Sequence, residues 1–138
     1  MQKFTQKQIE FVINVMIAAA VDTVECSLPQ SKDDQPHFDK KHVDTLVENV
    51  LHKLTWDLSI FYAQVTGDSM GCDEAGEIFY KLGLNDAINF LVNQRFNPKW
   101  KGIGKRFHNI PINKIAKGFA EVFEDKPDEE CSYYALHM

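Results

Sequence analysis

The residues with the clearest chemical character lie between positions 97 and 118, where cations alternate with aromatic rings. This stretch has six basic side chains and no acidic one. Such a composition is typical of an anion-binding surface, because cations neutralise phosphate and rings stack on bases. The candidate binding residues are Lys99, Trp100, Lys101, Lys105, Arg106, Phe107, Lys114 and Lys117.

The charges elsewhere in the chain leave a second interpretation of this basic segment open. Residues 1 to 96 sum to −6, residues 97 to 118 to +6 and residues 119 to 138 to −5, which gives the net charge of −5. The segment can therefore fold against the acidic tail at 124–138, or be solvated. An acidic average also disfavours wholesale binding to nucleic acid or to a membrane surface.

A second candidate for chemistry is the DEAGE sequence, which contains Asp73, Glu74 and Glu77. It resembles the E-E-x-x-E element of the all-α nucleotide pyrophosphohydrolases of the MazG type. The resemblance implies magnesium-binding carboxylates, completed in that family by a second acidic element on a later helix. Here Asp73 replaces the first glutamate, and no acid occurs between Asp86 and Glu121. A magnesium-dependent nucleotide hydrolase is therefore one alternative for the function.

No other stretch has a catalytic or cofactor signature. The five histidines and three cysteines show no nucleophile arrangement along the sequence, and there is no G-x-S-x-G motif. Cys26, Cys72 and Cys131 are odd in number and contain no C-x-x-C pair, which favours free thiols in a reducing cytoplasm. The sequence thus predicts no catalytic residue, cofactor or metal site, and it leaves open whether the protein is an enzyme.

The most apolar element is a helix predicted from Thr5 to Cys26. Thr5 followed by Gln8 forms a capping box, and from Phe11 to Val21 only Asn14 is polar. A helix that is apolar on almost every side is expected in the middle of a helical domain, with neighbours packed all round it. The apolar run is shorter than the roughly 18 residues that a membrane span needs.

A second, longer helix is predicted from Asp39, its N-cap, to Thr66. Its main apolar seam runs from Val43 to Val65, while Trp56 and Ile60 project on another side. Either a further helix of this chain or another protein must cover that second side. Trp56 and Ile60 are therefore the candidate apolar interface, and homodimerisation through them is left open.

Three shorter helices complete the predicted domain. One begins at Cys72 or Asp73 and ends at Leu82, the next is capped by Asn85 or Asp86 and runs to about Phe96, and the last has Pro111 at its first position. Loops are expected at 27–37 and 97–110, and an acidic tail at 124–138. The predicted fold is all-α, a single compact domain over residues 1–138 with about five helices around a buried N-terminal helix.

The leading functional hypothesis is a small acidic protein-binding factor of the cytoplasm. A core of ordinary size, oppositely charged segments and surplus apolar surface favour an inhibitor, immunity or adaptor protein that acts by macromolecular interaction. The expected partner is a protein, and no membrane association is expected. A nucleotide or nucleic-acid binder acting through residues 97–118 is the first alternative.

Overall fold

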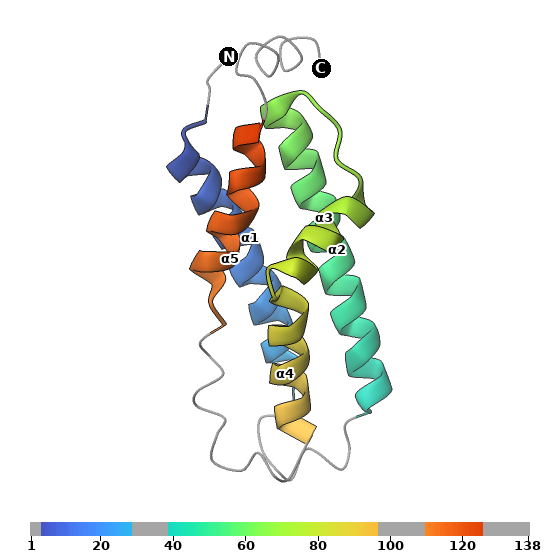
Figure 1. Cartoon of the computed structure of the whole chain (residues 1–138). Coiled ribbons are helices and arrows are strands. Elements are labelled where there is room, and N and C mark those ends of the chain that lie inside the picture. Colours follow the sequence, from blue (N-terminus) through green and yellow to red (C-terminus); the bar gives the residue numbers. More distant parts are fainter. Residues whose placement is uncertain (1–3, 29–38, 97–109, 126–138) are drawn as a thin grey trace.

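The computed structural model describes residues 4–28, 39–96 and 110–125, and every regular element within these ranges is a helix. The elements are α1 (Gln6–Cys26), α2 (Lys40–Thr66), α3 (Cys72–Lys81), α4 (Leu84–Phe96), α5 (Ile112–Ala120) and the short 3₁₀ helix η4 (Glu121–Asp125). These helices pack around one continuous apolar core (Figure 1). The predicted all-α fold with about five helices is confirmed.

Helix α1 begins at the predicted capping box. Thr5 Oγ1 accepts a hydrogen bond from the Gln8 N–H at 3.2 Å, and Gln8 Oε1 accepts one from the Thr5 N–H at 2.9 Å. The pair satisfies two N–H groups that the start of a helix leaves without partners. Further along α1, the Asn14 side-chain amide donates a hydrogen bond to the Asn113 side chain of α5. The one polar residue in the apolar run therefore joins two helices.

Side chains and glycines also set the ends of α2 and α3. The Asp39 carboxylate accepts a hydrogen bond from the Lys41 N–H at 3.0 Å, as expected of an N-cap. Gly67 after α2 and Gly83 after α3 have φ values of 73° and 88°, in the left-handed region that glycine adopts without strain. The prediction that Asn85 or Asp86 caps α4 is wrong, because α4 starts at Leu84, directly after the turn at Gly83.

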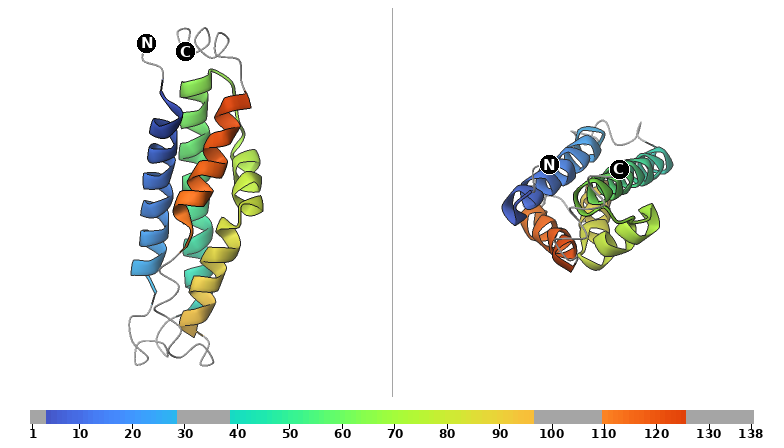
Figure 2. Two further views of the ribbon diagram at one scale, coloured as in Figure 1. Left: turned by 60° about the vertical axis from the view of Figure 1, so that its left-hand side comes forward. Right: turned by 90° about the horizontal axis from the view of Figure 1, so that it is seen from above.

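The helices form a bundle whose long members run side by side. Helices α1 and α2 are antiparallel neighbours, α5 packs mainly on α1, and α3 packs mainly on α2 (Figures 1 and 2). Seen from above, α1 and α2 occupy one side of the bundle, and α5, α3 and α4 occupy the other (Figure 2). The core lies between these two sides.

Aromatic rings connect the last helical segment to the rest of the bundle. Phe119 of α5 stacks on Phe79 of α3 with ring centroids 4.5 Å apart and an interplanar angle of 22°. Phe123 of η4 contacts Tyr62 and Phe61 of α2, at centroid distances of 5.0 and 5.7 Å. Each such ring contributes roughly 1.5–3 kcal/mol through burial. These contacts hold α5 and η4 against α2 and α3.

The expectation that the N-terminal helix is buried on all sides is wrong. One stripe of α1 is buried, formed by Ile9, Ile13, Ile17, Val21 and Val24. The opposite face is not, since Phe11 is 69% exposed and Val15 is 50% exposed. The physical reason is that α1 is an outer wall of the bundle. Its main neighbours, α5 and α2, cover adjoining sides and leave the outer face uncovered.

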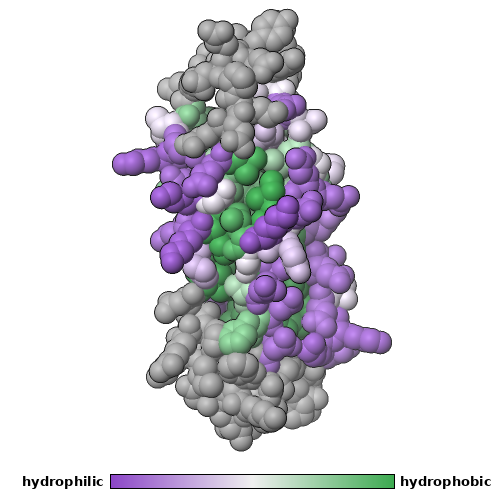
Figure 3. Space-filling model, viewed as in Figure 1, coloured by the Kyte–Doolittle hydropathy of each residue, from purple (hydrophilic) through white to green (hydrophobic). Residues whose placement is uncertain are grey.

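Polar side chains flank an apolar strip on the face of the molecule shown in Figure 3. Helix α5 packs closely on the residue after α3, because a Cβ at Gly118 would lie 2.7 Å from Leu82 Cδ2 and the Leu82 side chain would have to shift. Among the helices described here, none combines the length and the apolar composition needed to cross a bilayer.

Candidate functional site: an apolar face on helices α1 and α2

Two of the sequence-predicted site residues, Trp56 and Ile60, lie on the outer surface of α2. Trp56 is 55% exposed and Ile60 is 43% exposed. They are four residues apart and so lie on the same side of the helix, one turn from each other. No helix in the described ranges buries this side of α2, although the neighbouring sides of the same helix are buried at Leu58 and Ser59.

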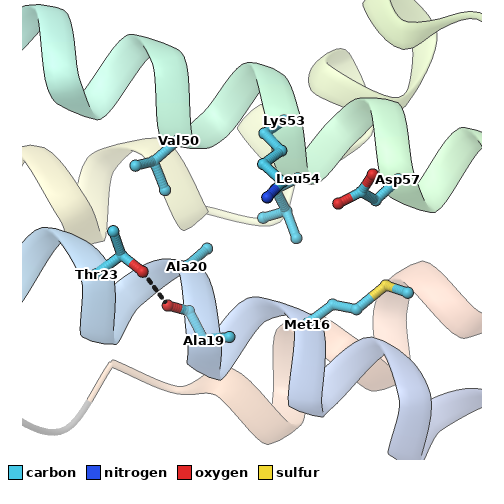
Figure 4. Close-up of a pocket in the computed structure, with 8 residues that line it drawn as sticks. All are labelled: Met16, Ala19, Ala20, Thr23, Val50, Lys53, Leu54 and Asp57. Atoms are coloured by element: carbon cyan, nitrogen blue, oxygen red, sulfur yellow. Dashed lines mark hydrogen bonds between the residues drawn. The ribbon is translucent and has the colours of Figure 1, made fainter.

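A groove of about 260 Å³ lies between α1 and α2 (Figure 4). Alanines on α1 leave the space, because their side chains are too short to reach across to α2. Each helix contributes four lining residues: Met16, Ala19, Ala20 and Thr23 from α1, and Val50, Lys53, Leu54 and Asp57 from α2. The Thr23 hydroxyl donates to the Ala19 carbonyl at 2.8 Å, so this polar group is satisfied within its own helix.

On each of the two helices, exposed apolar side chains lie within two turns of groove residues. On α1, Phe11 and Val15 are one turn apart, and Val15 is one turn from the groove residue Ala19. On α2, Trp56 and Ile60 follow the groove residues Lys53 and Asp57 by three positions each, again one turn. We call the surface formed by Phe11, Val15, Trp56, Ile60 and the eight groove residues the apolar face.

The sequence identified only two of the four exposed large apolar side chains on this face. Trp56 and Ile60 stood out because the seam of α2 accounted for its other apolar residues. The sequence predicts Phe11 and Val15 in the interior, because α1 is apolar on both faces and its sequence does not indicate which face is covered. No signal in the sequence distinguishes the exposed apolar face of α1 from the buried one.

Most of the predicted basic segment lies outside the described residues. This applies to Lys99, Trp100, Lys101, Lys105, Arg106 and Phe107. Residues 97–109 of the predicted 97–110 loop and most of the acidic tail fall outside with them. Lys114 and Lys117 are described, and both are exposed on α5. They lie three residues apart and so on one side of that helix.

The acidic residues of the DEAGE sequence do not gather around a common point in the structure. Asp73, Glu74 and Glu77 are all exposed on α3, and Glu77 lies 3.8 Å from Lys81 in an exposed ion pair. Within the described part of the chain, no three His, Cys, Asp or Glu side chains are grouped so that they would hold a metal ion.

The structure brings together one pair of chemically active side chains that the sequence did not indicate. Cys72 Sγ, at the first residue of α3, lies 3.8 Å from Nδ1 of His52 on α2. The same sulfur lies 2.8 Å from Thr55 Oγ1. The spacing of these two residues along the sequence does not predict their contact. His52 and Cys72 are twenty residues apart, and only the turn between α2 and α3 makes them neighbours.

Comparison with known proteins gives no relative for this chain: no protein-family model, no curated protein and no solved structure matches it.

Proposed function

We propose that this chain is a small acidic protein-binding factor of the cytoplasm, an inhibitor, immunity or adaptor protein, and that it holds its partner on the apolar face. The observation that carries this proposal is the exposure of four large apolar side chains, Phe11, Val15, Trp56 and Ile60, on the two adjacent helices that line one groove. Isolated exposed apolar residues are ordinary on a protein surface, whereas a contiguous group of them is typical of an interaction site.

The composition of the apolar face also suits a protein partner. Interface centres are enriched in aromatic residues and poor in charges. Here Phe11 and Trp56 supply the aromatic rings, and the charged groove residues are one lysine and one aspartate, Lys53 and Asp57. A groove between two antiparallel helices suits a partner helix with apolar side chains spaced three and four residues apart.

Capture experiments with matched variants test this proposal. The bait is the full chain, as wild type and as the variants Trp56→Asp, Phe11→Asp and Tyr80→Asp. Tyr80 is the control, because it is an exposed aromatic residue, 63% accessible, on α3 rather than on the apolar face. Bound proteins from a host lysate are identified and quantified, and the affinity of the purified partner is then measured by titration.

We expect one stoichiometric protein to be retained by the wild type and by Tyr80→Asp. Trp56→Asp and Phe11→Asp should each weaken its binding by about 30-fold or more, the loss of about 2 kcal/mol that defines a hot spot.

A partner that binds all four baits equally would contradict the assignment of the apolar face as the binding site. Capture of nucleic acid alone would replace this function with the alternative of a nucleic-acid binder. A wild-type dimer that the same two substitutions dissociate would identify the partner as a second copy.

A further inference from the structure

The Cys72 thiol is in contact with a side chain that can act as a base, the imidazole of His52. Its sulfur lies 3.8 Å from His52 Nδ1, 3.7 Å from the His52 carbonyl oxygen and 2.8 Å from Thr55 Oγ1. The Thr55 hydroxyl donates a hydrogen bond to the His52 carbonyl oxygen at 2.8 Å. Of the groups in contact with the sulfur, the imidazole is the one that can accept the thiol proton and keep it.

Cys72 is the first residue of α3 and so lies at the positive end of the helix dipole. Gly71 precedes α3 and makes no side-chain cap, so the N–H groups of the first turn have no capping side chain. The N-terminus of a helix carries a partial positive charge that stabilises a thiolate. Asp73 and Glu74 follow in the same turn and Glu48 precedes His52 on α2, but these carboxylates are exposed and partly screened by solvent.

The other described cysteine has the opposite surroundings. Cys26 is the last residue of α1, at the end where the helix carries partial negative charge. Its sulfur lies 3.9 Å from the Asp22 carboxylate, which repels a thiolate. Cys26 is nevertheless the more accessible of the two, since it is exposed while Cys72 is half-buried. Solvent exposure therefore favours reaction at Cys26, whereas the surrounding charges favour reaction at Cys72. A comparison of the two reaction rates shows which factor dominates.

We propose that Cys72 is a modification site that forms a mixed disulfide with small disulfides of the glutathione type, with His52 as the base. His52 Nδ1 takes the thiol proton, and the Cys72 thiolate attacks one sulfur of the small disulfide. The bond between Cys72 and that sulfur forms as the original S–S bond breaks. The leaving thiolate takes the proton from His52 and departs as the reduced thiol, so no further oxidant is required.

Site-resolved kinetics on the full chain test this inference. The reduced protein is mixed with oxidised glutathione at neutral pH and quenched at intervals, and each cysteine-containing peptide is quantified by mass spectrometry. We expect Cys72 to react at least about tenfold faster than Cys26, although Cys26 is the more exposed. In urea, where the helices are lost, the two rates should become similar.

Two substitutions on α2 separate the role of the base from general effects. His52→Gln should slow the reaction of Cys72 by about tenfold or more, because a positioned base is removed, and should leave Cys26 unchanged. His42→Gln is the control, since His42 is also exposed on α2 but ten residues away, and it should change neither rate. If His52→Gln perturbs folding, the two rates will become similar, as in urea. His52→Asn then provides the second variant, with the same expected loss at Cys72 alone. Equal rates at Cys26 and Cys72 in the folded wild type, or a Cys72 rate independent of His52, would overturn the inference.

Discussion

Phe11 and Phe119 are the same residue type on two helices that pack together, and they have opposite environments. Phe119 of α5 is fully buried and stacks on Phe79, whereas the Phe11 ring on α1 is largely in solvent. The phenylalanine ring therefore stabilises the fold at position 119 and does not stabilise it at position 11. The difference follows from the face of the helix on which each ring lies.

Alanine substitution at these two positions should separate the roles. Phe119→Ala should lower the free energy of unfolding by about 3–5 kcal/mol, because it removes a buried ring and leaves a cavity. Phe11→Ala should change it by no more than about 0.5 kcal/mol, as for other surface positions. Urea unfolding followed by circular dichroism measures both. A large loss with Phe11→Ala would mean that α1 is covered on its outer face as well.

At the scale of the element, local side-chain signals set where the long helices begin. The capping box at Thr5 and the N-cap Asp39 both make the hydrogen bonds that their sequence positions predict. Such caps depend on a few neighbouring residues, so they can be predicted without knowledge of the fold. Tertiary packing decides the start of α4 instead, where the turn at Gly83 places Leu84 in the core.

Two threonines separate the contribution of the cap of α1 from that of a hydroxyl inside a helix. Thr5→Ala should lower the free energy of unfolding by about 1 kcal/mol, because the Gln8 N–H loses its partner. Thr45 lies inside α2, where its hydroxyl donates to the Lys41 carbonyl, and Thr45→Ala should be neutral or stabilise by up to about 0.5 kcal/mol. Thermal and urea unfolding of the two variants provide the comparison. Equal losses would show that the cap does not contribute specifically.

At the scale of the whole molecule, the bundle has more apolar surface than its own described helices cover. Helix α1 buries one stripe and α2 buries its seam and the side under α3, and a set of large apolar side chains is left outside. Such surface does not stabilise the isolated fold, and it has a cost in solubility. The protein-binding function that we propose gives this surface a role.

A variant pair tests whether the exposed side chains contribute to folding. Val15→Gln combined with Trp56→Gln should change the free energy of unfolding by no more than about 1 kcal/mol, since both side chains are at least half exposed and glutamine is a good helix former. Leu58→Ala, at a fully buried position of α2, should cost about 2–5 kcal/mol. Denaturant unfolding of both variants measures the difference. A double variant as unstable as Leu58→Ala would place these residues in the core.

The sequence by itself determined the helical class, the number of helices and most of their ends, because periodicity, caps and glycines act over a few residues. It also identified Trp56 and Ile60, since one amphipathic seam accounted for the other apolar residues of α2. The extent of the domain over residues 1–138 and the anion-binding role of the basic segment remain predictions.

Only the tertiary structure decided which apolar surfaces are covered and which distant side chains meet. The exposure of Phe11 and Val15 depends on where α5 and α2 pack around α1, which the apolar pattern of α1 does not specify. The contact of Cys72 with His52 depends on the turn that returns α3 onto α2. Both are properties of helix packing, and packing is set by the combined surfaces of several elements, whereas a sequence pattern describes one element at a time.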